Sequence, residues 1–176
     1  MATTSLALRK LALAIAAAVT ATAGLSALNP AAASAASGMT IRIAPVSNAF
    51  LFVEVEGSSG QPGAGIIQWP YNGGQNQVWT FRPAGTDYEI VNQWSGQCIT
   101  TDGVAGHWLW QAPCQGLSGQ KWATALTPGN LIGYPIRNPA SNLYMDVQGA
   151  STTQGAHIGV WYGNGGHNQY FVGSVA

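Results

Sequence analysis

The sequence predicts an all-β domain in which three related units surround a pseudo-threefold axis. One stretch occurs twice, 92 residues apart and without a gap, so residues 54–77 and 146–169 share glycines, aromatic residues and amides at matching positions. Glycines and aromatic residues alternate through the chain, as expected for short strands joined by tight turns. No long segment after residue 36 has apolar residues at the 3.6-residue period of a helix. A repeat of this length indicates an architecture assembled from supersecondary units.

The N-terminal segment has the features of a secretory signal peptide. A basic pair at residues 9–10 precedes an alanine-rich apolar run over residues 11–25, and A-x-A sites follow at residues 31–33 and 33–35. We predict a signal peptide over residues 1–35, cleaved after Ala35 to within two residues, and therefore a secreted, extracellular protein. A membrane anchor is the alternative, but the apolar run is short and rich in alanine. We therefore expect no membrane insertion.

The rest of the chain, about 140 residues, suits one domain, which we place at residues 39–176. The repeats are expected at about 39–86, 87–130 and 131–176. Four basic residues then face six acidic residues, which gives a net charge of −2. Binding to nucleic acid requires clustered Lys and Arg side chains that displace counterions. We therefore expect no nucleic-acid partner.

Each unit is predicted to contain four strands, about twelve in all. The first strand is expected at 41–43, 88–92 and 134–138, and the second at 51–55, 97–101 and 143–147. We expect the third strand to carry Trp69, Trp110 or Trp161, and the closing strand to begin at Trp79, Trp122 or Phe171. Three units around one axis share a core and leave no open sheet edge. The closing aromatic residues are the predicted centre of that core.

The second unit contains both cysteines, Cys98 and Cys114. An exported chain meets an oxidising environment, so an even number of cysteines favours a disulfide. The bridge would close a loop of 17 residues and stabilise the domain by roughly 3 kcal/mol. Two free thiols are the alternative.

The closing motifs carry a resemblance to a known family. Residues 77–79 and 120–122 read Q-x-W, residues 169–171 read Q-x-F, and the second strands stand where that family has a Cys-Leu-Asp-Val phrase. Over residues 39–176 the chain resembles the ricin B-chain-type (R-type) lectins. The resemblance implies a β-trefoil fold and carbohydrate binding. The spacing of the two cysteines also matches the disulfide within the family's repeat.

A neutral sugar presents hydroxyl groups and one apolar face, so its site needs a few aimed polar groups beside a flat aromatic wall. The third unit has such a set in Asp146, Trp161, Asn168 and Gln169. The resemblance implies that Asp146 anchors vicinal hydroxyls and that Trp161 stacks on the sugar ring. It also implies that Asn168 adds hydrogen bonds and that Gln169 mostly holds the aspartate and its loop in place. A turn-capping aspartate and a packing tryptophan are the simpler alternatives.

Three further residues bear on this site. Tyr162 and His157 are expected to flank the pocket. Gly159 stands two residues before Trp161, where the family usually has a polar side chain, so one usual contact is missing.

The first unit is expected to hold a weaker site. Its set is Glu54, Trp69, Asn76 and Gln77. Glu54 replaces the usual aspartate and is one methylene longer, so its oxygens would intrude into a shallow pocket. We therefore expect this site to bind sugar more weakly or to prefer a different sugar.

The second unit departs most from the pattern. Thr100 stands at the aspartate position, Gly119 replaces the asparagine, and five residues are missing before Trp110. We expect this unit to be structural, with Trp108 and Trp110 serving as packing residues.

The sequence favours binding over catalysis. The three histidines have no H-E-x-x-H spacing, the two cysteines do not form a zinc pattern, and the few carboxylates form no obvious glycosidase pair. We expect no catalytic residues, no metal and no cofactor. The first hypothesis is a secreted module that binds galactose-type sugars or a plant or cell-surface polysaccharide. The second is a non-lectin β-trefoil that binds or inhibits a protein, whose identity the sequence does not indicate.

Overall fold

The computed structural model of the protein describes residues 38–129 and 132–176. The signal peptide predicted for residues 1–35 lies outside the described residues. The described part is built from strands and from turns of 3₁₀ helix three residues long, which confirms the all-β prediction. No helix in this part is long and apolar enough to cross a membrane.

The strand bounds follow the repeat. The first unit contains β1 (Met39–Pro45), β2 (Leu51–Val55), β3 (Ile66–Pro70) and β4 (Trp79–Ala84). The second contains β5 (Asp87–Asn92), β6 (Cys98–Thr100) and β7 (Trp110–Ala112). The third contains β8 (Tyr134–Pro135), β9 (Arg137–Asn138), β10 (Leu143–Val147), β11 (Ile158–Trp161) and β12 (Tyr170–Val175). The 3₁₀ turns are η1 (Val46–Asn48), η2 (Glu56–Ser58), η3 (Gln75–Gln77), η4 (Ser118–Gln120), η5 (Gln148–Ala150) and η6 (His167–Gln169).

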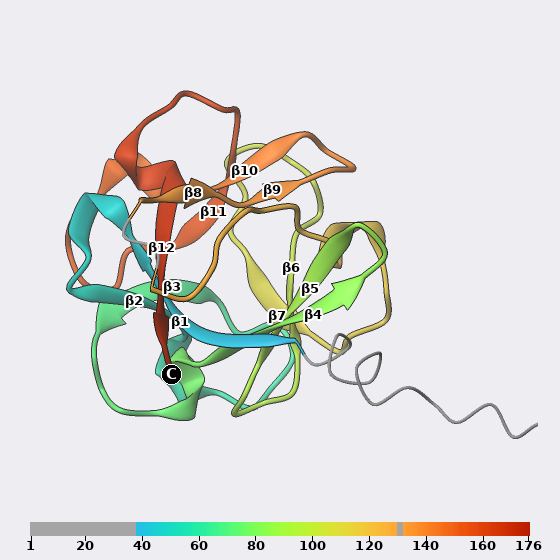
Figure 1. Cartoon of the computed structure of the whole chain (residues 1–176), viewed down its shortest axis with the longest axis horizontal. Coiled ribbons are helices and arrows are strands. Elements are labelled where there is room, and N and C mark those ends of the chain that lie inside the picture. The colour runs from blue at the N-terminus through green and yellow to red at the C-terminus, as the bar shows by residue number, and fades with distance from the viewer. Residues whose placement is uncertain (1–37, 130–131) are drawn as a thin grey trace, which may run out of the picture.

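Six strand positions close into a barrel. The strands β5, β4, β1, β12 and β8 pair in that order (Figure 1). The ring is completed by Trp122, which pairs with Tyr88 of β5, and by Ala123, which pairs with Arg137 of β9. The closing strand predicted for the second unit is thus reduced to two bridges. The strand predicted at 134–138 is split into β8 and β9, and Pro135, which has no backbone N–H to donate, lies at the break.

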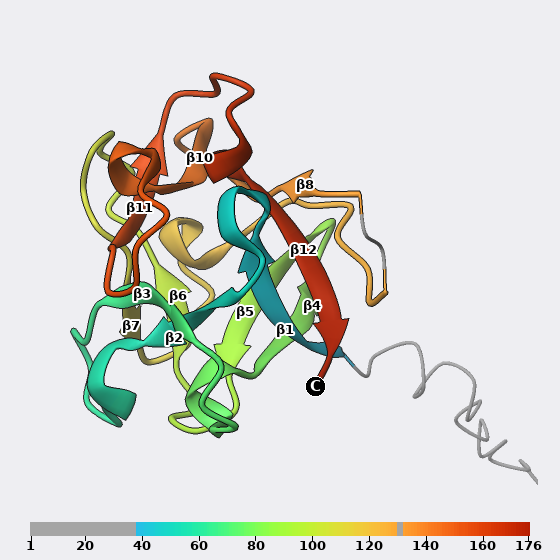
Figure 2. The ribbon, with the colours of Figure 1, turned by 90° about the vertical axis from the view of Figure 1, so that its left-hand side faces the viewer.

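Three hairpins gather on one side of the barrel strands (Figure 2). They are β2–β3, β6–β7 and β10–β11. Cyclic bridges join them: Gly65 to Trp110, Trp108 to Gly159, and His157 to Ile67. In each bridge, a residue of one unit pairs with the residue that lies two positions after its own counterpart in the next unit. Gly65, Trp108 and His157 therefore occupy equivalent positions around the axis, and the fold is a β-trefoil.

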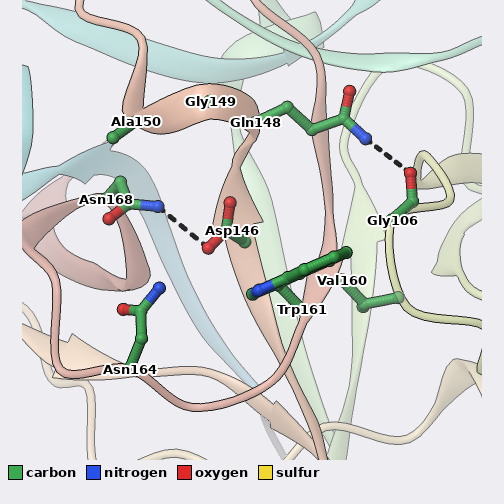
Figure 3. A pocket seen from close by; sticks show the side chains of 9 residues that line it. All are labelled: Gly106, Asp146, Gln148, Gly149, Ala150, Val160, Trp161, Asn164 and Asn168. Carbon is green, nitrogen blue, oxygen red and sulfur yellow. Dashed lines mark hydrogen bonds between the residues drawn. The ribbon is translucent and has the colours of Figure 1, made fainter.

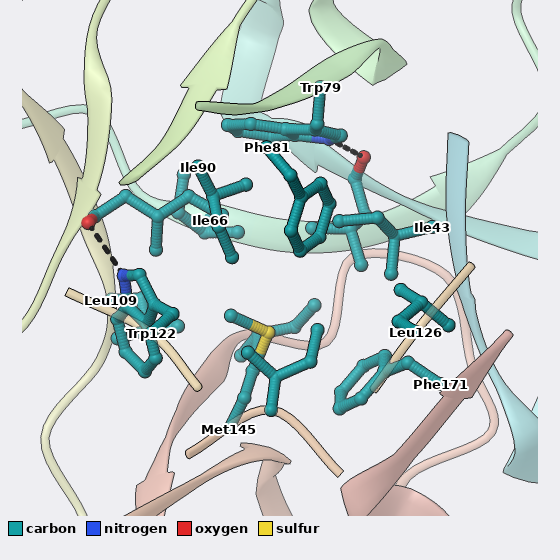
Figure 4. Close-up of a cluster of buried hydrophobic side chains, with 14 of the residues drawn as sticks. Ile43, Ile66, Trp79, Phe81, Ile90, Leu109, Trp122, Leu126, Met145 and Phe171 are labelled. Carbon is teal, nitrogen blue, oxygen red and sulfur yellow. Dashed lines mark hydrogen bonds between the residues drawn. The ribbon is translucent and has the colours of Figure 1, made fainter. Parts of the chain in front are cut away.

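The closing aromatic residues all lie in the buried core cluster, as predicted (Figure 4). Trp79, Trp122 and Phe171 are fully buried. The indole N–H of Trp79 donates to the carbonyl of Val53 at 2.8 Å, and that of Trp122 donates to the carbonyl of Ile99 at 3.1 Å. A layer of aliphatic side chains from all three units packs against these rings, among them Ile43, Ile66, Ile90, Leu109, Ile136, Met145 and Ile158. Each unit thus shares the burial that it cannot achieve alone.

The predicted disulfide is confirmed. Cys98 in β6 is bonded to Cys114, two residues after β7, with the two Cα atoms 5.1 Å apart. The bridge ties the hairpin of the second unit, whose strands are only three residues long.

Candidate functional site

A pocket of about 460 Å³ opens in the third unit (Figure 3). It is lined by Gly106, Asp146, Gln148, Gly149, Ala150, Val160, Trp161, Asn164 and Asn168. The structure therefore brings together three of the four residues predicted for this unit. The fourth, Gln169, is buried behind the pocket wall.

The β10–β11 hairpin positions the carboxylate and the indole. Asp146 pairs with Gly159, and Trp161 lies two residues further along β11. Directly opposed residues share a face of the sheet, as do residues two apart on one strand. Asp146 and Trp161 therefore project on the same side. The absence of a side chain at Gly159 is a steric requirement, because a Cβ there would lie 2.5 Å from the carbonyl oxygen of His107.

The carboxylate of Asp146 is held through one oxygen. The side-chain amides of Asn168 and Gln169 both donate to its Oδ2 at 2.8 Å. The Gln169 amide also donates to the carbonyl of Tyr162 and accepts from the backbone N–H of Asn164. No described residue donates to Oδ1, so this oxygen is left to accept hydrogen bonds from a ligand. Gln169 therefore connects the carboxylate of Asp146 to the backbone of the loop at Tyr162 and Asn164.

Burial shifts the titration of the two site carboxylates in the same direction. Desolvation raises the pKa of Asp146, and the amides of Gln169 and Asn168 oppose the rise only in part. The pKa of Glu54 is raised by burial in the same way, against hydrogen bonds from Gln77 and Asn76.

Trp161 provides a flat apolar wall. It is 45% exposed, and the edge of its ring lies 3.2 Å from the point where a Cβ of Gly106 would stand. Tyr162 flanks this wall in an edge-to-face contact with ring centres 5.7 Å apart. His157 does not flank the pocket as expected, because its ring stacks on Trp108 and lines a different pocket.

The first unit assembles its predicted residues in a more closed form. The amides of Asn76 and Gln77 donate to Oε2 of Glu54, as their counterparts do to Asp146. Asn72 also donates to the same oxygen, at 3.0 Å. Its counterpart Asn164 makes no side-chain bond to Asp146 and lines the open pocket. The extra methylene of Glu54 lets its carboxylate reach Asn72, so one side of the first site is taken up. Trp69 nevertheless stays 37% exposed.

The second unit differs from the expected alignment. Thr100, at the aspartate position, pairs with Trp110, whereas Cys98 pairs with Ala112. Ala112, and not Trp110, therefore occupies the position of Trp69 and Trp161, and the predicted alignment was wrong by two residues. Trp108 is 53% exposed and stacks on His157, so it is not a buried packing residue, whereas Trp110 is partly buried; both line a second pocket.

Sequence reasoning missed six of the nine residues that line the third-unit pocket, namely Gly106, Gln148, Gly149, Ala150, Val160 and Asn164. Asn164 belongs to the repeated Asn-Gly-Gly phrase, and Gln148 follows Asp146 by two positions on the same face, so both had a local signal. Gly106 comes from the second unit, and no local pattern connects it to Trp161. Within residues 38–129 and 132–176, no group of three or more His, Cys, Asp or Glu residues is arranged to hold a metal ion.

The fold and the pocket together define a ricin-type β-trefoil. The model of the ricin-type beta-trefoil lectin domain-like family matches residues 32–107 and 75–161, and the chain belongs to this family. A search of curated proteins finds no significant match.

Solved structures share the fold. The designed threefold-symmetric protein ThreeFoil is 26% identical with a TM-score of 0.70, and the match covers 78% of this chain and 99% of that one. A ricin B-like lectin from Macrolepiota procera, solved with lactose, is 24% identical with a TM-score of 0.67, covering 80% and 97%. An exo-β-1,3-galactanase from Clostridium thermocellum is 25% identical with a TM-score of 0.71, covering 78% of this chain but only 30% of that enzyme.

Proposed function

We propose that this protein is a secreted, non-catalytic module that binds neutral carbohydrate in the third-unit pocket. Asp146 accepts hydrogen bonds from sugar hydroxyls through Oδ1, Asn168 supports the same hydroxyls, and Trp161 stacks on the apolar face of the ring. The first unit binds more weakly through Glu54 and Trp69.

One observation carries the proposal: a buried carboxylate, one of whose oxygens has no donor among the described residues, stands beside a half-exposed indole. A carboxylate makes strong charge-assisted hydrogen bonds with hydroxyl groups, and an indole offers a rigid wall with little loss of entropy. This pairing suits a polyol ring with one apolar face. A site with so few contacts binds a monosaccharide near the millimolar range, which corresponds to about −4 kcal/mol.

The sugar class is inferred from relatives. The Macrolepiota lectin was solved with lactose, and the Clostridium relative is a galactanase. These names favour a galactose-type sugar, free or within a plant or cell-surface polysaccharide. Family membership supports binding rather than catalysis for this chain.

Asp146→Asn tests the site without disturbing its frame. The amide oxygen of asparagine still accepts from Asn168 and Gln169, whereas alanine would leave both amides short of an acceptor, at about 1–3 kcal/mol for each unsatisfied group. On a glycan array we expect the natural protein to bind galactose-type glycans and the variant to lose at least about tenfold in affinity with unchanged circular dichroism. Trp94→Ala is the control, because Trp94 is exposed and lines neither pocket that carries an indole wall. A blank array for the natural protein would favour the protein-binding alternative.

Secretion has a separate test. We expect the protein recovered from culture medium to begin at Ala36, to within two residues. Retention of the full chain inside cells would contradict this part of the proposal and leave the binding site unaffected.

A further inference from the structure

A second pocket of about 460 Å³ lies where the three hairpins meet around the axis. It is lined by Glu56, Gly63, Gly65, Trp108, Leu109, Trp110 and His157. Among the three equivalent residues at the axis, Trp108 and His157 stack with ring centres 3.6 Å apart and planes 8° apart. The third is Gly65, which has no side chain. The opening exists because one of three converging side chains is absent.

Polar groups converge over Gly65. A Cβ on this glycine would lie 3.0 Å from Oε2 of Glu56 and 3.5 Å from Nδ1 of His157. The Glu56 carboxylate is exposed and receives no hydrogen bond from the described residues, and His157 Nδ1 is buried without a partner in the same part of the chain. The pocket therefore offers unpaired polar atoms beside an indole wall, which is the chemistry of the third-unit pocket.

The two pockets lie on one continuous face. Trp108 pairs with Gly159, and Trp161 stands two residues further along the same strand. Such diagonal neighbours share a face and have Cα atoms roughly 7–8 Å apart. A smaller hollow, lined by Asp102, Gly106, His107, Trp108 and Trp110, shares Gly106 with the first pocket and both tryptophans with the second.

Gln148 forms the boundary between the pockets. Its amide donates to the carbonyl of Gly106 at 2.7 Å, and its oxygen accepts from the indole N–H of Trp108. This hydrogen bond fixes the position of the Trp108 indole, which lines both the second pocket and the smaller hollow. The indoles of Trp161 and Trp108 therefore stand as two successive walls on one surface.

We propose that the third-unit pocket and this axial pocket are two subsites for a single oligosaccharide chain. Trp161 stacks on one sugar and Trp108 on a later sugar of the same chain. His157 covers one face of the Trp108 indole and braces it, and the exposed carboxylate of Glu56 accepts from the hydroxyls of that later sugar. The inference rests on the proposed carbohydrate-binding function and specifies its ligand as a chain rather than a monosaccharide.

Calorimetry on the whole mature protein tests the inference with two sugar series: galactose against β-1,3-linked galactotetraose, and xylose against xylotetraose. We expect the tetrasaccharide of the series that binds to bind at least about tenfold more tightly than its monosaccharide. Trp108→Ala and Glu56→Ala should each remove most of this gain and leave the monosaccharide Kd within about twofold. Trp94→Ala, which removes an exposed indole outside both pockets, should change neither value.

The outcomes separate the two proposals. If the tetrasaccharide gain is absent, or survives both Trp108→Ala and Glu56→Ala, the axial subsite is wrong while monosaccharide binding still supports the proposed function. If the natural protein binds none of the four sugars, the proposed function fails and the subsite fails with it. Because Glu56 is exposed and makes no side-chain bond within the described residues, Glu56→Ala decides the matter even if Trp108→Ala does not fold.

Discussion

One methylene group separates the two best-matched sites of this molecule. Asp146 and Glu54 each receive two amide donors from the 3₁₀ turn that follows, through Oδ2 and Oε2 respectively. Only Glu54 also bonds Asn72. Both carboxylates keep one oxygen without a donor among the described residues, but Glu54 also ties up the side-chain amide of Asn72, whereas the counterpart Asn164 lines the open pocket. At the scale of the residue, side-chain length decides which copy of the repeat is open.

Shortening Glu54 is therefore expected to open the first unit. In Glu54→Asp the carboxylate no longer reaches Asn72, while Asn76 and Gln77 still donate to it. We expect the number of galactose molecules bound per chain to rise from one toward two, measured by calorimetry. The indole N–H signal of Trp69 should shift with sugar in NMR spectra. An unchanged stoichiometry and an unmoved Trp69 signal would show that something other than Asn72 closes this site.

The buried carboxylate also predicts a pH dependence of stability. Burial raises the pKa of Asp146 above its usual value of 3.8. Below that value the group is protonated in both the folded and unfolded states and contributes nothing. As the pH rises through the folded pKa, the charged form is penalised only in the folded state, so this group lowers stability. We expect the melting temperature of Asp146→Asn, relative to the natural protein, to increase between pH 3 and pH 7.

Sugar affinity should rise with pH where the stability contribution of Asp146 falls, because the sugar hydroxyls bond the ionised carboxylate. It should fall on acidification at a pH above the usual titration of an aspartate. A melting-temperature difference between Asp146→Asn and the natural protein that is flat across this range would contradict the raised pKa.

At the scale of the element, each hairpin supports its neighbour. The indole of Trp161 packs on Gly106 of the second unit, and that of Trp69 packs on Gly155 of the third, at 3.2 Å and 3.5 Å from the respective Cβ positions. The third such glycine, Gly63, meets nothing within 4 Å because the equivalent strand position holds Ala112. Each of the two predicted sites thus uses side chains of one unit and backbone of another.

This arrangement gives a matched pair of substitutions. Gly106 and Gly63 have φ angles of +90° and +89°, so alanine at either position meets a left-handed backbone penalty of about 1–2 kcal/mol. Only the Cβ at residue 106 also meets the ring of Trp161. We expect both variants to lose similar stability in urea unfolding, but only Gly106→Ala to lose galactose affinity, by several-fold. Equal affinities would show that Trp161 does not depend on this support.

Local patterns predicted most of the elements. Period-2 alternation identified the strands, the even number of cysteines indicated the disulfide, and the Q-x-W and Q-x-F motifs indicated the core residues. The alignment of the second unit failed because Trp110 resembles the missing aromatic residue, although its strand register pairs it with Thr100 and puts Ala112 at the aromatic position. Register depends on hydrogen bonding between strands, and the sequence alone did not reveal it.

Contacts between units were the second feature that the sequence did not predict. The side chains of Asp146, Asn168 and Gln169 were predicted together because the repeat shows them together. Gly106 and the Trp108–His157 stack arise only when three hairpins meet at the axis, so no pattern within one unit indicates them. Missing Gly106 and misplacing His157 have this common cause.

At the scale of the whole molecule, the closed barrel makes the three units interdependent. The barrel takes strands from all three units, and no unit forms a closed ring by itself. The ring is closed by the short segment at Trp122 and Ala123. The indole of Trp122 is fully buried and bonds the carbonyl of Ile99. A residue of the unit without a predicted sugar site therefore holds together the sites of the other two.

Trp122→Ala should reveal this interdependence. Removing a fully buried indole costs about 3–5 kcal/mol, a large fraction of the stability of a small domain. We expect the urea midpoint measured by far-UV circular dichroism to fall sharply, and galactose binding to be lost at the same urea concentration as secondary structure. Trp94→Ala, at an exposed position, should stay within about 0.5 kcal/mol of the natural protein. If binding in the third unit outlasts the circular dichroism transition of Trp122→Ala, that unit would be stable without the second, and closure of the barrel would not be what holds the site together.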